Sequence, residues 1–377
     1  MTVITGFPRY NVESIGPKYR GKVFLTEHSN GIRIIRTQIL PLPRWDVVRK
    51  IEYFLAPIAF LLMALFDRKH DVAIAYSPPI TMGICMALLK ISRGTPYIFN
   101  VQDIHPQALR DLGFLADGLM WRFLQWCERL AYRSSDRVSV HSDGNAAFLT
   151  ESRDVPRSKV VTVPNWVDTE VLCPGERMNW FRKEHGLDDD FVVSFAGTMG
   201  TSQDMATIVK AADLLRKNEN IRFVLVGDGV EKPMVERQIA NLMLKNVKLL
   251  PMQPRHLYPS ILHASDLCLV TLKGDVVTPV VPSKLLSIMA CGRPVLASLD
   301  MSGDTPRIID EARCGVCVEA ENAQAMGAAV ERLYRDRDEC ERMGENGREY
   351  CLRRFSKLSA MDLYAGIFEE VLASNVG

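Results

Sequence analysis

Residues 281–298, VPSKLLSIMACGRPVLAS, predict a loop, a helix, a glycine stop and a buried strand in one short stretch. Ser283 is expected to open the helix, because a serine hydroxyl satisfies free N–H groups there, and Gly292 is expected to end it. Val295–Ala297 then reads as a strand covered on both faces, so the stretch is half of a βαβ unit. The helix start at Ser283 and Lys284 would attract an anion. An ordinary buried helix with a solvated lysine remains the alternative.

The composition is that of a globular protein large enough for two domains. The chain has 377 residues, of which 47% are hydrophobic and 24% charged, which excludes a disordered or collagen-like class. Its 46 basic and 45 acidic residues give no overall field that would suggest nucleic acid as a partner. Among nine cysteines the only CxxC is Cys314 to Cys317, without the second pair that a zinc site needs. We therefore interpret this pair as part of a strand and turn, with reduced thiols in a cytosolic compartment.

The first part of the chain alternates short apolar strands with helices, which favours a parallel α/β domain because such strands are covered on both sides. One predicted helix spans residues 114–133, and its aromatic side chains are expected in the core. The predicted strands are Val3–Thr5, Ile32–Ile35, Val72–Tyr76, Tyr97–Val101, Arg137–His141 and Val160–Val163.

The most hydrophobic run is IEYFLAPIAFLLMALF, residues 51–66. It is shorter than the roughly twenty residues that span a bilayer. One interpretation is a helix lying on an anionic membrane surface; the other is a helix buried in the α/β layer. The first interpretation depends on the flanking basic residues Arg44, Arg49, Lys50, Arg68 and Lys69.

Residues 165–186 are polar and irregular, which is typical of an interdomain linker. A second alternation follows, with predicted helices at 204–217, 233–245 and 257–263. Its predicted strands are Phe191–Ala196, Arg222–Val226, Val247–Leu250, Leu267–Thr271 and Gly315–Val318. We predict an N-terminal domain over residues 1–170, a second parallel α/β domain over residues 171–355, and a helix over residues 356–377 that packs back on the first domain.

Two strand ends run into glycine loops, Phe195–Gly200 (FAGTMG) and Val226–Gly229 (VGDG). Glycine lets backbone N–H groups approach a phosphate closely, and the carboxyl ends of parallel strands face one crevice. The sequence has neither a GxGxxG fingerprint nor a GxxxxGK[ST] loop, which argues against a nicotinamide enzyme and a kinase.

Taken in order, the motifs resemble a family 4 glycosyltransferase of the GT-B fold, in the branch that builds bacterial O-antigen, capsule or colanic acid. The resemblance covers nearly the whole chain. It is carried by PNWVDTE (164–170), FAGTMG (195–200), IRFVLVGDG (221–229), NVKLLP (246–251), ASDL (264–267) and PSK with MACGRPV (282–284 and 289–295).

This resemblance implies two Rossmann-like domains facing a central cleft and a retaining transferase without a catalytic metal or other cofactor. A nucleotide-sugar donor would bind the C-terminal domain, and a polyprenyl-diphosphate-linked saccharide acceptor would bind the N-terminal domain at the inner face of the bacterial plasma membrane. A cation suits the donor phosphates, because the leaving nucleoside diphosphate gains negative charge. The implied donor-binding residues are Gly197, Gly200, Gly227, Gly229, Met252, Lys273, Ser283, Lys284 and Ser287.

The chain departs from the family pattern at several positions. The family's two glutamates would fall at Pro279 and Ser287, and Ser287 is expected to touch a ribose hydroxyl instead. In the N-terminal domain, Gln102 stands where many members have a histidine, and Gln102 and Asp103 resemble the VQD variant of this branch. His105 follows closely, either as a third catalytic candidate or as a residue of a helix start.

The family normally opens with a strand, a glycine loop and a helix ahead of the strand that here is Val3–Thr5, so we expect one βα unit of roughly thirty residues to be absent. An extended form is accordingly expected to be more soluble and more active. Two alternatives to a transferase remain. One is a degenerate GT-B scaffold that binds a nucleotide-sugar without turnover, and the other is a sugar-nucleotide epimerase of the same architecture.

Overall fold

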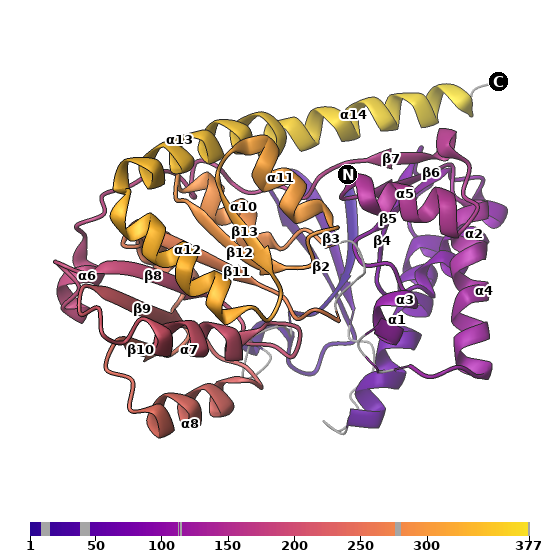
Figure 1. Cartoon of the computed structure of the whole chain (residues 1–377). Coiled ribbons are helices and arrows are strands. Elements are labelled where there is room, and N and C mark those ends of the chain that lie inside the picture. The colour runs from indigo at the N-terminus through magenta and orange to yellow at the C-terminus, as the bar shows by residue number, and fades with distance from the viewer. Residues whose placement is uncertain (9–15, 38–45, 112, 114, 276–279, 376–377) are drawn as a thin grey trace. The chain divides into compact units, whose positions relative to one another are not determined.

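The computed structural model describes residues 1–8, 16–37, 46–111, 113, 115–275 and 280–375, with only the backbone described for 46–54. The chain forms two compact units, and each is described by itself (Figure 1). The first unit comprises Met1–Val140, Ala146–Val161 and Gly366–Gly377, and the second comprises His141–Asn145 and Thr162–Ala365.

The second unit is built on a six-stranded sheet in the order β10-β9-β8-β11-β12-β13, in which every neighbouring pair is parallel. Sequence analysis predicted this alternation of strands and helices, and the structure confirms it. The strands are β8 (Phe191–Ala196), β9 (Ile221–Val226), β10 (Val247–Leu250), β11 (Leu267–Thr271), β12 (Val295–Leu299) and β13 (Gly315–Glu319).

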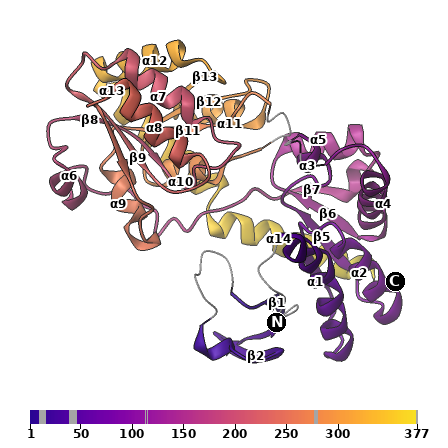
Figure 2. The same cartoon turned by 90° about the horizontal axis from the view of Figure 1, so that it is seen from below.

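Both faces of this sheet are covered, which explains why its strands are continuous apolar runs. All six residues of β8 are buried: Phe191, Val193 and Phe195 pack in one core cluster, and Val192 and Ala196 pack in another. Figure 2 shows the helices on the two faces. They are α6 (Trp180–His185), α7 (Met205–Leu214), α8 (Lys232–Leu242), α9 (Tyr258–His263), α10 (Ser283–Ala290), α11 (Asp304–Ala312), α12 (Ala323–Arg335) and α13 (Arg337–Arg354). The last helix, α14 (Lys357–Ser374), follows α13.

The strand order places a topological switch point between β8 and β11. From β8 the chain moves outward to β9 and β10, and then returns to β11 on the other side of β8 before moving outward to β12 and β13. In open α/β sheets, ligands bind beside the carboxyl ends of the strands at such a point.

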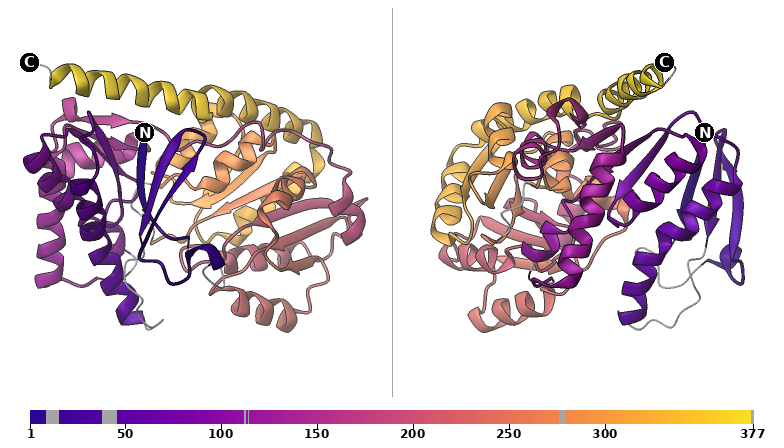
Figure 3. Two further views of the ribbon diagram at one scale, coloured as in Figure 1. Left: turned by 180° about the vertical axis from the view of Figure 1, so that it is seen from behind. Right: turned by 90° about the vertical axis from the view of Figure 1, so that its right-hand side faces the viewer.

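The first unit contains two sheets, and one of them includes an antiparallel pair that the sequence analysis did not predict. One sheet has the order β4-β5-β6-β7, with β4 (Ala73–Ser77), β5 (Tyr97–Val101), β6 (Arg137–Val140) and β7 (Val160–Thr162). The other has the order β1-β3-β2, with β1 (Thr2–Gly6), β2 (Phe24–Ser29) and β3 (Ile32–Thr37), visible in Figure 3. Strand β2 was not predicted. It pairs antiparallel with β3 through a turn at Asn30 and Gly31, both at positive φ, which is a hairpin signal in the sequence.

The helices of the first unit are α1 (Asp46–Phe66), α2 (Met82–Arg93), α3 (Gln107–Asp111), α4 (Leu119–Ser134) and α5 (Asp143–Ser152), the last beginning in the second unit. Helix α4 begins later than predicted, and Phe114 lies outside the described residues. Its aromatic side chains are only partly in the core. Trp121 and Tyr132 are buried, whereas Phe123 and Trp126 are exposed and stack at 6.1 Å between ring centroids.

Two segments outside the sheets, residues 165–186 and the C-terminal helix, can be compared with the sequence analysis. The stretch 165–186 is not wholly irregular, because α6 forms within it, with the Asn179 side chain accepting hydrogen bonds from the backbone of Phe181 and Arg182. The last residues of α14 belong to the first unit, where Arg137 pairs with Glu370 at 3.3 Å. As far as the structure describes the helices, none is long and apolar enough to cross a membrane.

Candidate functional site

The glycine loops after β8 and β9 meet at the switch point of the second unit. Gly197 donates to Val226 O at 2.9 Å, and Met199 donates to Asp228 O at 2.8 Å. Glu231 in turn donates to Met199 O at 3.0 Å, so the two loops are held together by backbone bonds. We call the two loops together with the start of α10 the switch-point site.

Two glycines are required by the close approach of these loops. A Cβ at Gly227 would lie 2.0 Å from Gly197 O, and a Cβ at Gly229 would lie 2.3 Å from Met199 O. No side chain fits at either position without moving backbone. Gly200 differs, because a Cβ there would meet nothing closer than 3.9 Å. Packing therefore accounts for Gly227 and Gly229 but does not explain Gly200.

Lys284 reaches into this site from the first turn of α10. Its Nζ donates to Gln203 Oε1 at 3.2 Å and lies 4.8 Å from the centre of the Phe195 ring. Its Cε is 2.7 Å from where a Cβ at Gly197 would lie, so the lysine runs along the glycine loop. Burial lowers the pKa of Lys284 to about 8, and no carboxylate in the described part of the chain forms an ion pair with it. The site thus holds a cation for which no described residue supplies a counter-charge.

The start of α10 differs from its prediction in one respect. Pro282 occupies the N-cap position and Ser283 is the first helical residue, so no side chain caps the first N–H groups. Ser283 is exposed, and its carbonyl accepts a hydrogen bond from Ser287 Oγ at 3.2 Å. Uncapped N–H groups beside a lysine attract an anion. Ser287 also hydrogen-bonds the phenol of Tyr258, whose pKa burial raises above its usual value.

The remaining candidates of the second unit lie around these loops. The backbone N–H of Lys273 donates to Ser202 O at 3.0 Å, and its ammonium pairs with Glu231 at 3.5 Å. Met252 follows the carboxyl end of β10, and its side chain is 45% exposed. Pro279, where the family's first glutamate would fall, lies outside the described residues.

Three candidates of the N-terminal part lie at the carboxyl end of β5 in the first unit. Gln102 Nε2 donates to Asn100 Oδ1 at 2.6 Å, and its backbone N–H donates to Ser77 O at 3.0 Å. Asp103 is exposed and His105 is half-buried. Burial lowers the pKa of His105 below its usual value, and the charge of Asp103 opposes that effect. Burial therefore favours the neutral imidazole, whose ring nitrogen can accept a hydrogen bond.

The sequence analysis did not identify three contacts of the switch-point site. The Phe195 ring contacts the ammonium of Lys284, Glu231 forms an ion pair with Lys273, and Tyr258 hydrogen-bonds Ser287. Glu231 stands two residues after the VGDG loop, which is a signal that the sequence did contain. Among the described residues, no group of three or more His, Cys, Asp or Glu could hold a metal ion. Strand β13 begins directly after Cys314 and contains Cys317, and burial raises the pKa of both thiols to about 12.

Comparison with known proteins gives matches over both parts of the chain. The family model of the glycosyl transferases group 1 matches residues 177–350, and that of the glycosyl transferase 4-like domain matches residues 4–166. WbjE of Pseudomonas aeruginosa, named as a glycosyltransferase, is 30% identical over 72% of this chain and 70% of its own length. WcaI of Escherichia coli K12, named as a colanic acid biosynthesis glycosyl transferase, is 26% identical over 87% of this chain and 82% of its own length.

Solved structures share the fold. The Anabaena protein HepE in complex with UDP-glucose superposes with a TM-score of 0.69 at 16% identity, over 90% of this chain and 86% of HepE.

Proposed function

The chain belongs to the group 1 glycosyltransferases of the GT-B fold and acts in polysaccharide biosynthesis, and from this premise we propose its donor, acceptor and mechanism. The donor is a nucleoside diphosphate sugar bound at the switch-point site. The acceptor is a lipid-linked saccharide at a membrane surface. Transfer retains the anomeric configuration and needs no catalytic metal ion.

The observation that carries the donor assignment is Lys284, a half-buried lysine that forms no ion pair with any described residue and lies beside uncapped helix N–H groups. A diphosphate supplies the missing counter-charge. As the bond from the sugar to the diphosphate breaks, the leaving group gains negative charge, and a preorganised cation stabilises that charge without a metal. HepE, which has the same fold, binds UDP-glucose, and this supports a nucleotide-sugar here.

In this proposal Gly197, Gly200, Gly227 and Gly229 surround the diphosphate, Lys273 and Ser283 assist Lys284, and Met252 lies by the base. Ser287 contacts a ribose hydroxyl. Gln102, Asp103 and His105 serve the acceptor, with the neutral imidazole of His105 accepting a hydrogen bond from the acceptor hydroxyl.

The membrane part of the proposal rests on exposed apolar side chains of the first unit. Leu55, Ile58, Leu62 and Phe66 of α1 are between 38% and 88% exposed and recur every three to four residues, so they form one stripe. Helix α2 packs against both α1 and α4. It adds Leu88 and Ile91, and α4 adds Leu119, Met120, Phe123 and Trp126.

We call these ten residues the apolar helix face. Patches of this kind on soluble proteins mark interaction sites, and aromatic rings such as Trp126 suit a lipid headgroup region. Arg68 and Lys69 follow α1 and are exposed, so an anionic leaflet would attract this end. The other basic residues expected there, Arg44 and the side chains of Arg49 and Lys50, lie outside the described residues. The interpretation of residues 51–66 as a surface helix thus becomes part of the proposal.

The proposal is tested with a panel of nucleotide-sugars and a polyprenyl-diphosphate-linked saccharide, in buffer with EDTA. We expect one donor to give both free nucleoside diphosphate and an elongated lipid-linked product, whose anomeric proton keeps the donor configuration by NMR. Donor binding without release of diphosphate would support the inactive scaffold instead. An inverted product, or activity lost in EDTA and restored by Mg²⁺, would overturn the mechanism.

A further inference from the structure

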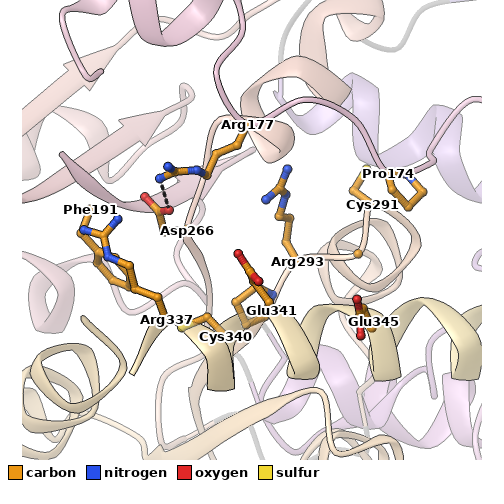
Figure 4. Close-up of a pocket in the computed structure, with 12 residues that line it drawn as sticks. Pro174, Arg177, Phe191, Asp266, Cys291, Arg293, Arg337, Cys340, Glu341 and Glu345 are labelled. Atoms are coloured by element: carbon orange, nitrogen blue, oxygen red, sulfur yellow. Dashed lines mark hydrogen bonds and ion pairs between the residues drawn. The ribbon is translucent and has the colours of Figure 1, made fainter. Parts of the chain in front are cut away.

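A cavity of about 290 Å³ lies in the second unit, at the amino ends of its strands (Figure 4). Phe191 is the first residue of β8, Asp266 directly precedes β11, and Pro294 directly precedes β12. The switch-point site lies at the carboxyl ends of the same parallel strands, so the sheet separates the two. We call this hollow the amino-end cavity.

One carboxylate of the cavity is already neutralised by the protein. Asp266 pairs with Arg177 at 2.7 Å and with the fully buried Arg182 at 2.5 Å, and it accepts a hydrogen bond from Val192 N at 2.7 Å. Arg182 does not line the cavity, and its guanidinium also donates to the backbone carbonyls of Ala264, Leu187 and Asp190. With two guanidinium groups on one carboxylate, the Arg177 side of the cavity keeps an excess positive charge.

Two further arginines line the cavity without carboxylate partners. Arg293 donates from Nη2 to Gly175 O at 2.9 Å, while its buried Nε has no hydrogen-bond partner. The guanidinium of Arg337 lies 5.5 Å from the centre of the Phe191 ring. Neither side chain forms an ion pair within the part of the chain that the structure describes. An arginine has donors and no acceptor, so these groups call for a ligand that offers acceptors.

Helix α13, which begins with Arg337, also supplies acceptors. Glu341 and Glu345 are one turn apart on α13, are exposed, and form no ion pair with any described residue. Figure 4 shows both on the helix that borders the cavity. An ionised carboxylate only accepts hydrogen bonds, so these two side chains call for a ligand with donors such as hydroxyl groups.

Close packing fixes α13 relative to Arg293. A Cβ at Gly344 of α13 would lie 2.2 Å from Gly292 O, the residue before Arg293. Helix α13 therefore sits directly on the loop between α10 and β12. Arg293 and the carboxylates of α13 are held on either side of a formed cavity, as a binding site requires.

We propose that the amino-end cavity binds a small phosphorylated polyol, such as a sugar phosphate. The phosphate lies among Arg177, Arg293 and Arg337, and the hydroxyl groups donate to Glu341 and Glu345. Phosphate is favoured over a carboxylate because its three free oxygens can meet guanidinium groups from three separate elements, whereas a carboxylate has two oxygens in one plane. The volume is close to the lower end of small-molecule sites, which excludes a nucleotide-sugar.

The test is calorimetric titration of the full chain with glucose 6-phosphate as the probe, with glucose, inorganic phosphate and glutamate for comparison. We expect one binding site, tighter for glucose 6-phosphate than for any of the other three. Arg293→Gln and Arg337→Gln should each weaken binding at least tenfold. Arg342→Gln is the matched control, since it removes the same charge from an exposed residue of α13 outside the cavity, and it should change nothing.

Two further measurements distinguish binding at the amino-end cavity from binding at the switch-point site, and a direct loss of binding from a loss caused by misfolding. Binding should persist in Lys284→Met, because that lysine lies at the other end of the sheet. Arg337 is exposed, so its variant should melt at the wild-type temperature, which keeps the test decisive if Arg293→Gln fails to fold. The proposal is overturned if Lys284→Met abolishes binding, if glutamate binds best, or if Arg337→Gln and Arg342→Gln bind glucose 6-phosphate equally.

Discussion

Replacing Lys284 with methionine should weaken the binding of UDP and at the same time stabilise the protein. Methionine keeps the length of the side chain along Phe195 and Gly197 but removes the charge. Loss of a hydrogen bond to a charged group costs about 1.5 to 3 kcal/mol, so Kd should rise roughly 10- to 150-fold at pH 7.

The wild-type protein should also show a pH dependence that the variant lacks. With a pKa of about 8 in the free protein, the protonated fraction of Lys284 falls from about nine-tenths at pH 7 to about one-tenth at pH 9. The Kd for UDP should therefore rise roughly tenfold across this range, because only the protonated state is competent. The terminal phosphate of UDP titrates near pH 6 and is ionised throughout.

The charge of Lys284 should strengthen UDP binding but lower the stability of the folded protein. Burial lowers the pKa of Lys284 from 10.5 in the unfolded chain to about 8. The cost of burying the cation is thus fully present below pH 8 and disappears as the pH rises through 10.5. At pH 7, Lys284→Met should melt at a higher temperature than the wild type, and the difference should vanish at high pH.

The assays are calorimetric titration with UDP at pH 7, 8 and 9, and thermal unfolding from pH 7 to a pH above the unfolded pKa of 10.5. Lys284→Arg serves as the control, because its charge is retained at every pH used. If the methionine variant bound UDP as tightly as the wild type at pH 7, Lys284 would have no role at the diphosphate.

Three further predictions follow from other contacts. Gly227→Ala should destabilise the second unit by about 3 kcal/mol, because its Cβ would overlap backbone, and a lower urea midpoint measures this; an unchanged midpoint would contradict it. Leu62→Gln with Phe66→Gln should weaken sedimentation with anionic liposomes at low salt while leaving UDP binding unchanged, and undiminished sedimentation would remove this end of α1 from the membrane surface. Asp266→Ala should cost about 3 to 5 kcal/mol of stability by leaving the buried Arg182 without its counter-ion, as judged by chemical unfolding, and a cost below 1 kcal/mol would argue against that pairing.

The sheet of the second unit was predictable because both its faces are buried. Its strands are then uninterrupted apolar runs such as Phe191–Ala196, which need no knowledge of their partners to be recognised. The glycine loops and Lys284 were predictable for a related reason, since all carboxyl ends of a parallel sheet meet at one edge.

The first unit was less predictable because its early strands are half-exposed. Strand β2, FLTEHS, has no buried residue, so neither alternation nor an apolar run marks it. Only the turn at Asn30 and Gly31 signals the hairpin. On α4, helical periodicity identified the helix but could not say which of its two wide apolar stripes faces the core, and Trp126 proved to face outward.

The amino-end cavity could not be predicted from the sequence at all. Asp266 and Arg293 lie in the motifs ASDL and MACGRPV, but Arg177 and Arg337 lie in none, and no pattern indicates that the four meet. Only the folded sheet brings them to one place.

Helix α10 is a single rigid element that connects the switch-point site to the amino-end cavity. It begins with Ser283 and Lys284 at the switch point, and it is followed by Cys291, Gly292 and Arg293 at the amino-end cavity. Its eight residues span only about 12 Å at the usual helical rise. A displacement of one end along the axis is therefore transmitted to the other, and any influence of one occupant on the affinity of the other must be matched by an equal influence in return.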